Sequence, residues 1–491
     1  AVMLFTSGTT GTSKCVMLCQ RNIFSVVTSA CTQVYFCKED VLVSVLPLHH
    51  TYELACTLAA TNFGAKICIN DSIRHALKNF KEYQPTGLIL VPLFVTTMYK
   101  KIQSEAKRSG KDKILSVGTK VASKLSLAGI DLSEKLLRYT LRVDGEVLEE
   151  KTLTVACAPY DTVEIIPDAA FPATCKMGCT VTVALCETDG TDFAQLEQEV
   201  DVAVEPQVLT APAVTYTEDA HHIYAKGDRF TYAFSKQHGM FDSLVVDGKE
   251  KLAGPVTLTA YRAIIDNEMY VYENWKYTDQ FKAENMDRAF TKVYETTIAD
   301  GRITAKCSLA GVSRVPMIRY TLSIGVCADG SMDWSVQADV RDWASWIPRF
   351  GFVFPLKEKD AAFRYFGRGP WENYCDMSHH VTLDWFDSTA SQEYVPYIMP
   401  QEHGNHAGVR SLSVDGLTFE ADRPFEANVS LYSIRQLDTA RHIDEIGASE
   451  ATYLRIDYRN AGVGSQSCGP ELAPQFRITE KQIDFAFRVR I

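Results

Sequence analysis

The spacing of apolar residues changes near Arg138, and this change constrains the fold more than any other feature. Before it, short apolar runs alternate with longer stretches at helical spacing, such as 65–69 followed by Ser72–Tyr83. Such strand–helix alternation predicts α/β layers with a largely parallel sheet. After it, apolar and polar residues alternate one by one, as in 139–143, which is the period of a half-buried β-strand. The chain therefore combines two architectures.

The part after the change is expected to be all-β and to form two modules. Residues 139–206 predict an Ig-like β-sandwich, and a stretch framed by prolines then serves as a linker. Residues 215–491 predict a large β-sandwich, because turn signals such as Asp247–Gly248 recur and no long amphipathic helix interrupts them. The predicted fold class is mixed: mainly all-β, preceded by a partial α/β fragment over 1–138.

Charge divides the chain at the same point. Residues 1–138 hold 17 Lys and Arg against 9 Asp and Glu, and the remainder holds 33 against 52. The basic excess gathers in Lys100–Lys135, on predicted solvated helix faces, so no nucleic-acid partner is expected.

Apolar runs fall short of the ~18 residues of a membrane span. The 14 cysteines are scattered without a C-x-x-C pair, which favours reduced core thiols and a cytoplasmic location; self-association stays open.

A loop rich in hydroxyl groups follows the first predicted strand, and 5–14 reads FTSGTTGTSK. Backbone N–H groups, hydroxyls and one cation suit phosphate oxygens. The glycine spacing differs from that of the G-x-x-x-x-G-K-[ST] loop, so composition alone leaves an ordinary flexible turn equally open. The candidate phosphate ligands are Thr6, Ser7, Gly8, Thr9, Thr10, Gly11 and Lys14.

This loop, together with LPLHHTYE at 46–53 and the stretch 91–102, resembles the adenylate-forming enzymes, specifically the long-chain acyl-CoA synthetases. The resemblance covers about 1–138 and implies a loop that grips ATP phosphates during fatty-acid activation. Ser13 and Cys15 replace the family's proline and glycine. The family's adenine-binding strand and its later lysine-bearing domain are absent from this sequence. We therefore expect a truncated fragment that neither adenylates nor binds ATP usefully. Ala1, in place of Met at the start of a predicted strand, also suggests a fragment.

Four motifs after 139 occur in order and with plausible spacing. They read YRAIIDN at 261–267, GRGPWENYCD at 367–376, PQEHG at 400–404 and GVGSQSCGP at 462–470. They resemble the C-terminal region of β-galactosidases of glycoside hydrolase family 2 over nearly all of 139–491. In that family, two of these loops reach the sugar pocket of a central (β/α)8 barrel.

The resemblance implies that Asp266, Asn267 and Cys468 bind substrate. Cys468 stands where some members place a tryptophan against the sugar, and a thiol cannot supply that stacking surface. Tyr261 and Glu268 are further departures, for Trp and Asp. The two carboxylates that glycoside hydrolysis needs belong to the barrel, and no run of eight strand–helix units is present here. No catalytic residue is therefore expected, and the chain alone should be inactive.

Metal and cofactor sites are not expected in this chain. Glu402, His403 and His406 can be drawn as a metal or acid/base cluster, but a third firm ligand is not evident. We interpret them as surface loop residues. A complete family-2 β-galactosidase would use Mg and Na ions in its barrel.

Three functions are weighed for the whole chain. The first is a partner chain that binds a β-galactoside only together with a barrel-bearing large chain. The second is a purely structural sandwich module, and the third is a remnant long-chain acyl-CoA synthetase. Because neither family normally carries the other's domain, we interpret the junction at 138–139 as a gene-model or assembly fusion or a rearrangement.

Overall fold

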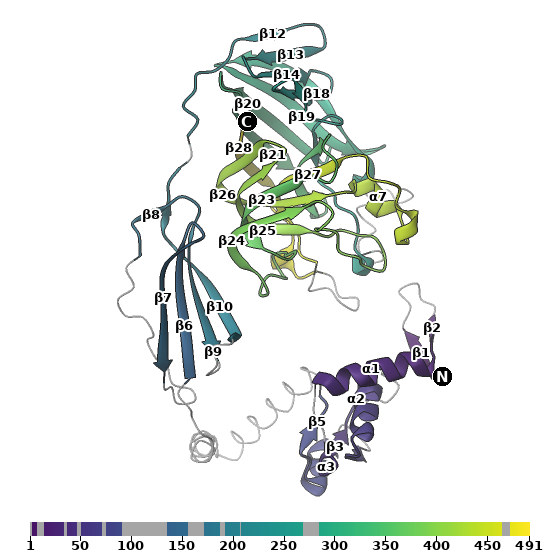
Figure 1. Ribbon diagram of the computed structural model, residues 1–491. Helices are drawn as coiled ribbons and strands as arrows, with labels where there is room; N and C mark the ends of the chain where they lie inside the picture. Colours follow the sequence, from purple (N-terminus) through teal and green to yellow (C-terminus); the bar gives the residue numbers. More distant parts are fainter. Residues whose placement is uncertain are drawn as a thin grey trace. The chain divides into compact units, whose positions relative to one another are not determined.

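The computed structural model confirms a fold that is mostly β (Figure 1). The chain divides into two compact units, 1–133 and 134–491. No helix in the described part of the chain is long and apolar enough to cross a membrane. The structure describes residues 2–6, 14–33, 37–46, 51–70, 75–90, 135–155, 171–186, 192–206, 208–268, 284–463 and 472–491.

The N-terminal unit contains a small parallel sheet, as the strand–helix alternation predicts. Its strands β3, β4 and β5 pair in the order β4-β3-β5, with both pairings parallel. The bounds are β3 Val41–Ser44, β4 Lys66–Ile69 and β5 Gly87–Leu88, with helices α1 Gln20–Gln33, α2 Thr51–Asn62 and α3 Ala76–Tyr83.

The first predicted strand does not join this sheet. Strand β1 (Val2–Thr6) pairs antiparallel with β2 (Lys14–Leu18). The physical reason is the length of the connection, since residues 7–13 are too few for the crossover of a dozen or more residues that parallel strands require. The expected largely parallel arrangement therefore applies to β3, β4 and β5 and not to the chain's first strand.

The second unit begins with a small β-module. Its four-stranded antiparallel sheet has the order β10-β9-β6-β7. Tyr139 and Leu141 are fully buried, and Cys179 packs with them. Strand β6 runs without a break through residues 138–139. The bounds are β6 Lys135–Val143, β7 Glu146–Val155, β9 Cys179–Cys186 and β10 Asp192–Val200, with a parallel pair β8 Thr174–Cys175 and β11 Ala203–Val204.

The large body contains a five-stranded sheet and a twelve-stranded sheet. The first has the order β12-β13-β14-β15-β16, with β12 Tyr216–Glu218, β13 His222–Lys226, β14 Phe230–Ser235, β15 Met240–Val246 and β16 Lys249–Glu250. The main path of the second is β17-β22-β27-β26-β28-β21-β20-β19-β18, with β23, β24 and β25 joined at β26.

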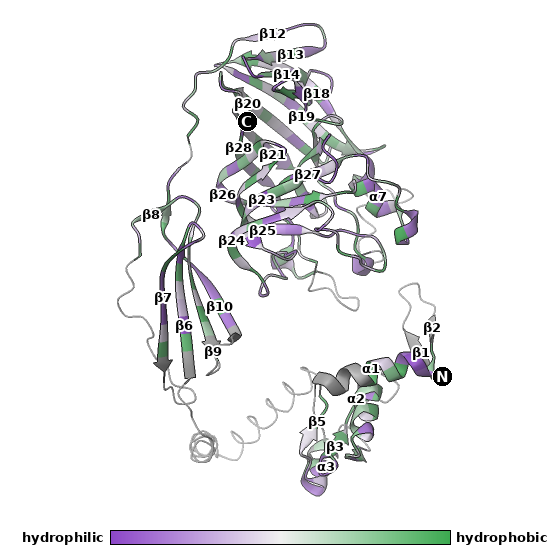
Figure 2. Ribbon diagram, viewed as in Figure 1, coloured by the Kyte–Doolittle hydropathy of each residue, from purple (hydrophilic) through white to green (hydrophobic). Residues whose placement is uncertain are grey.

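The twelve strands carry both hydrophobic and hydrophilic residues, as Figure 2 shows, and in some of them, such as β20 and β21, buried residues alternate with more exposed ones. Their bounds are β17 Thr257–Thr259, β18 Ala289–Ala299, β19 Arg302–Gly311, β20 Ile318–Val326, β21 Met332–Val340, β22 Arg349–Leu356, β23 Ala362–Gly369, β24 Thr382–Thr389, β25 Asn405–Val414, β26 Leu417–Ser430, β27 Thr452–Asn460 and β28 Gln482–Arg490. A short helix, α7 (Ile434–Thr439), connects β26 to β27.

Aromatic rings hold the two sheets of the large body together. Trp334 on β21 is completely buried. It stands opposite Phe487 in the β21–β28 register, and their ring centroids lie 5.4 Å apart in a stacked arrangement. Phe241 from the five-stranded sheet lies 5.7 Å from the Trp334 ring. Such aromatic pairs stabilise a core beyond their buried area, so the large body has one continuous core.

Cys179 and Cys307, among the cysteines whose side chains the structure describes, are free thiols that lie buried among apolar side chains. This agrees with the prediction that the cysteines act as small apolar core residues rather than as a disulfide framework.

Candidate functional site

The loop that carries Asp266 and Asn267 follows β17. Residues 261–265 are all buried, each at most 9% exposed. The short 3-10 helix Asp266–Glu268 then turns Asp266 outward into solvent and leaves Asn267 partly exposed. The backbone N–H of Asp266 donates to Gln401 Oε1 at 2.8 Å. The side chains of Asp266 and Asn267 are therefore carried by a backbone that the buried residues 261–265 and the hydrogen bond to Gln401 hold in place.

Arg262 anchors this loop from the interior. Its guanidinium is fully buried. Nη2 donates to Glu268 Oε1 at 2.5 Å and to the carbonyl oxygen of Gly462 at 3.0 Å. Nη1 donates to the carbonyl oxygen of Ala461 at 2.5 Å and to Asn460 Oδ1 at 2.9 Å. One side chain thus joins the loop of Asp266 to the stem of the loop that carries Cys468.

The stem of the second loop requires glycine for reasons of space. A Cβ atom on Gly462 would lie 2.4 Å from Asp376 Oδ2. The same carboxylate accepts the backbone N–H of Val463 at Oδ1, at 2.9 Å. Asp376 therefore holds the loop at the point where it leaves β27. Cys468 itself lies outside the described residues.

The segment Tyr397–Gly404, together with Glu372, adjoins the loop that carries Asp266. Glu372 Oε2 accepts the backbone N–H of Gly404 at 2.8 Å, and the Tyr397 hydroxyl donates to Glu372 Oε1. Burial raises the pKa of Tyr397 well above its usual value, followed by the hydrogen bond to Glu372, and the charge of Asp266 contributes as well. Trp371, which immediately precedes Glu372 in the sequence, is 68% exposed. The region around Asp266 thus also contains aromatic and acidic side chains.

Sequence reasoning did not select Arg262, Asp376, Tyr397 or Gln401 as site residues. All four stand in or beside the motifs that carry the resemblance, so their position was a usable signal. Their roles depend on partners far along the chain. Arg262, for example, lies 200 positions before its partner Gly462.

Glu402, His403 and His406 are buried, at 3%, 3% and 1% exposure, so the interpretation as surface loop residues was wrong. Glu402 accepts two hydrogen bonds from Arg349, from Nη1 at 3.1 Å and Nη2 at 2.7 Å. The amide of Asn460 donates to Glu402 Oε1 at 3.0 Å. The partners that permit burial come from other strands, which local sequence does not show.

The charges around Arg349 form one buried network. Arg349 Nε lies 3.0 Å from Asp457 Oδ2, and both side chains are completely buried. Burial raises the pKa of Asp457 to about 7 and that of Glu426 to about 7. Burial would also raise the pKa of Glu402, but three guanidinium groups, Arg349 first, lower it overall. The network therefore contains two carboxyl groups with raised pKa values, Asp457 and Glu426, which favour the protonated form. It also contains one with a lowered pKa, Glu402, which favours the ionised form.

His406 belongs to a separate buried contact. Its Nε2 lies 2.8 Å from Glu393 Oε2, and its Nδ1 lies 3.0 Å from the Tyr365 hydroxyl. Within the described ranges, no group of three or more His, Cys, Asp or Glu residues is arranged to hold a metal ion.

The predicted phosphate loop is described only at its two ends. Thr6 closes β1 and Lys14 opens β2, and the two are register partners across the hairpin. Ser7, Gly8, Thr9, Thr10 and Gly11 lie outside the described residues.

Comparison with known proteins gives two family matches. Residues 226–491 match the family model "Beta galactosidase small chain", and residues 1–158 match the model "AMP-binding enzyme". A putative aldose 1-epimerase from Escherichia coli K12 is a structural match with a TM-score of 0.32 and 10% identity, covering 54% of this chain and 97% of that one.

Curated relatives are named β-galactosidase. The protein from Actinobacillus pleuropneumoniae is 27% identical over 372 residues, which are 73% of this chain and 36% of that protein. The protein from Staphylococcus xylosus is 27% identical over 305 residues, 60% of this chain and 29% of that protein. The chain thus spans about a third of the length of the relatives it matches. Because the small-chain model matches more than half of its residues, the chain belongs to the β-galactosidase small-chain family.

Proposed function

We propose that this chain is the non-catalytic part of a glycoside hydrolase family 2 β-galactosidase, acting in the cytoplasm. In this proposal it completes the sugar pocket of a separate barrel-bearing chain, and it binds a β-galactoside only together with that chain. The two catalytic carboxylates and the Mg and Na ions of a complete enzyme belong to the barrel chain. The small-chain match and the relatives named β-galactosidase support this assignment.

The observation that carries the proposal is the position of Arg262. Its guanidinium bonds both to Glu268, at the end of the Asp266 loop, and to the carbonyl of Gly462, at the stem of the Cys468 loop. Two loops predicted from the sequence to face sugar are thus fastened to one buried group. In our proposal Asp266 and Asn267 hydrogen-bond to hydroxyls of the galactoside, Cys468 contacts it, and Arg262 positions them.

Loop substitutions in a reconstituted enzyme test this role. A suitable barrel source is the Actinobacillus pleuropneumoniae relative without the part that aligns with this chain. With nitrophenyl β-galactoside as substrate, Asp266→Ala and Asn267→Ala should each raise KM about tenfold, the cost of one lost hydrogen bond of about 1.4 kcal/mol. Asp228→Ala, at an exposed residue in the turn between β13 and β14, is the matched control. Loop variants that behave like Asp228→Ala would refute the assignment of the loops.

For the N-terminal part we propose a truncated adenylate-forming fragment, a remnant of a long-chain acyl-CoA synthetase that does not bind ATP usefully. The AMP-binding match supports its origin. Calorimetric titration with ATP should give no measurable heat of binding, whereas a clear isotherm at micromolar affinity would contradict the proposal.

We also propose that 1–138, 139–206 and 215–491 are separate modules and that the first was joined to the others by a fusion or rearrangement. Trypsin cannot test this, because Arg138 is itself a cleavage site. A peptide from another protease that crosses 138–139 would show that the fusion exists as protein, and its absence beside abundant flanking peptides would indicate a gene-model artefact.

A further inference from the structure

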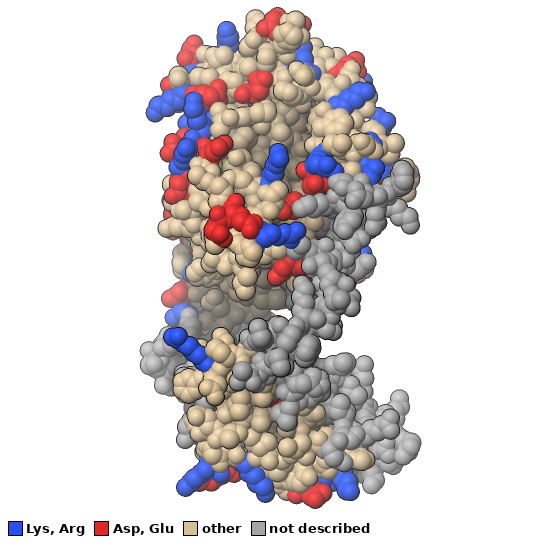
Figure 3. Space-filling view, turned by 90° about the vertical axis from the view of Figure 1, so that its right-hand side faces the viewer, with Lys and Arg blue, Asp and Glu red and all other residues tan. Residues whose placement is uncertain are grey.

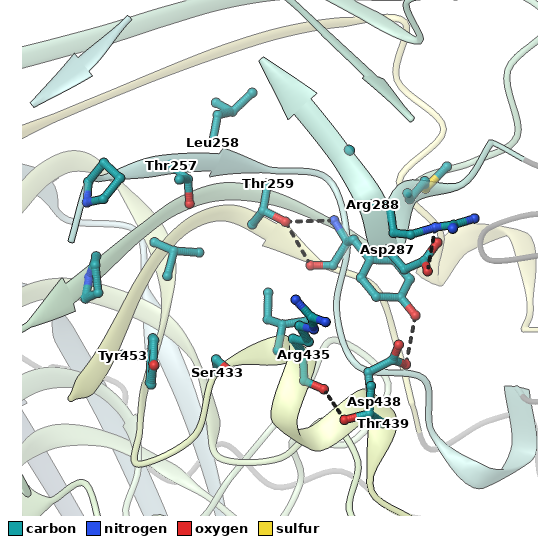
Figure 4. Close-up of a pocket in the computed structure, with 17 residues that line it drawn as sticks. Thr257, Leu258, Thr259, Asp287, Arg288, Ser433, Arg435, Asp438, Thr439 and Tyr453 are labelled. Carbon is teal, nitrogen blue, oxygen red and sulfur yellow. Dashed lines mark hydrogen bonds and ion pairs between the residues drawn. The ribbon is translucent and has the colours of Figure 1, made fainter. Parts of the chain in front are cut away.

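A pocket of about 650 Å³ opens in the large body beside the start of the Asp266 loop (Figure 4). Small-ligand pockets in proteins have volumes of about 300–1,000 Å³. Its lining comes from elements far apart in the sequence: β17, β22, α7, β27 and the turn before β18. The pocket is therefore a product of the tertiary fold and not of one flexible loop.

Tyr261 forms a fixed part of the lining. The side chain is 4% exposed, and its hydroxyl donates to Asp438 Oδ1 at 2.9 Å. Its backbone N–H donates to Thr259 Oγ1, and its carbonyl oxygen accepts from the same hydroxyl, both at 3.1 Å. Burial raises the pKa of Tyr261 far above the usual value, so the phenol stays neutral. A pre-organised polar wall reduces the entropy lost when a ligand binds.

Three further polar groups remain available to a ligand. Arg435 on α7, Thr257 on β17 and Tyr453 on β27 line the pocket, and Figure 4 shows them on three separate segments of the chain. Their guanidinium and hydroxyl groups form no hydrogen bond or ion pair with any described residue. By contrast, Ser433 Oγ accepts the Gln436 N–H of its own helix at 3.2 Å. The available groups converge from three elements.

The charges that line the pocket are balanced. Two arginines, Arg288 and Arg435, and two aspartates, Asp287 and Asp438, line the pocket, and Arg288 Nε lies 3.7 Å from Asp287 Oδ2. Figure 3 shows acidic and basic side chains interspersed over the described surface of the face that it presents. An anion would meet two carboxylates and a cation two guanidiniums. Balanced charge favours a neutral ligand whose groups both donate and accept hydrogen bonds.

The apolar part of the pocket lining suits the C–H groups of the same kind of ligand. Pro255, Val353 and Pro355 line the pocket together with the polar groups, and their apolar surfaces can contact the C–H groups of a sugar ring. Hydroxyl groups of a saccharide would be met by Arg435, Tyr453 and Thr257. We propose that this pocket is a second carbohydrate site, which binds a neutral saccharide unit without the barrel chain and without Asp266 or Asn267.

Binding to the full chain alone tests this inference. Methyl β-galactoside and lactose, titrated by calorimetry and by ligand-observed NMR, should bind with dissociation constants of about 1–10 mM, near −3 to −4 kcal/mol. Arg435→Gln and Tyr453→Phe should each weaken binding by about fivefold or more, the effect of one lost hydrogen bond. Thr257→Val gives a third, nearly isosteric variant.

Testing the chain without a barrel chain separates this site from the proposed galactosidase role. The exposed Arg423→Gln should bind sugar as the unchanged protein does. The inference is overturned if neither sugar binds, if inorganic phosphate binds in their place, or if Arg435→Gln, Tyr453→Phe and Thr257→Val all leave sugar binding unchanged. Because no barrel chain is present, each of these failures leaves the complementation proposal standing.

Discussion

Arg349 is completely buried in the large body, and its charge is paired with those of Glu402 and Asp457. Removing one partner of such a group leaves an uncompensated buried charge. Arg349→Met should therefore lower the free energy of unfolding by about 3–5 kcal/mol, measured by urea denaturation. The exposed Arg423→Gln should change it by less than about 0.5 kcal/mol. Equal effects of the two substitutions would contradict the described network.

Glu426 predicts a pH dependence of stability. Burial raises the pKa of Glu426 from its usual value near 4.5 to about 7, so the folded state holds a proton that the unfolded state releases. The free energy of unfolding should therefore fall as pH rises from about 4.5 to about 7. Glu426→Gln cannot titrate, and its stability should fall less steeply over that window.

The matched control for this prediction is Glu450→Gln, an exposed carboxyl. Urea midpoints measured between pH 4.5 and 8 give the comparison. Parallel pH profiles for Glu426→Gln and the unchanged protein would show that Glu426 titrates normally in the folded state.

Prediction from sequence at the residue scale depends on where the partners of each residue lie. Asp266 and Asn267 were selected through a local motif, and their role stays a prediction. The prediction that Glu402 lies at the surface is wrong, because its partners Arg349 and Asn460 lie 53 and 58 residues away and do not show in the local sequence. Nothing within a few residues of Glu402 indicates that its charge is compensated.

At the scale of elements, the fit of Gly462 against Asp376 gives a further prediction. A Cβ atom at 462 would lie 2.4 Å from Asp376 Oδ2, so Gly462→Ala must displace the loop stem. We expect a loss of about 1–3 kcal/mol in the free energy of unfolding, typical of overpacking. Combining it with Asp376→Ala removes the clash, so the double variant should lose less than the sum of the single losses. Additive losses would show that the two groups do not compete for space.

The strands themselves follow largely from the sequence. The Asp–Gly turn signals at 144–145, 247–248, 300–301 and 415–416 are confirmed, since both residues of each have positive φ, as tight hairpin turns require. The order of the twelve strands could not be predicted, because β26 pairs with both β27 and β28 and β21 pairs with β28. Those pairings join segments that no local pattern relates.

At the scale of the whole molecule, the two units differ in how much core they contain. The N-terminal unit has small separate clusters, such as Leu42 with Ala60 and Ile89, and it leaves Ile69 66% exposed and Phe24 69% exposed. The large body has one continuous core. Backbone amides of 2–90 should therefore exchange hydrogen much faster than those of the large body, measured by mass spectrometry. Slow, uniform exchange across 2–90 would contradict this expectation.

The most direct test of the account is a titration of a barrel-bearing chain with this chain, followed by nitrophenyl β-galactoside hydrolysis. The account predicts no hydrolysis by this chain alone and an activity of the mixture that rises and saturates near one equivalent. Hydrolysis by this chain alone, or a mixture no more active than the barrel chain by itself, would contradict it.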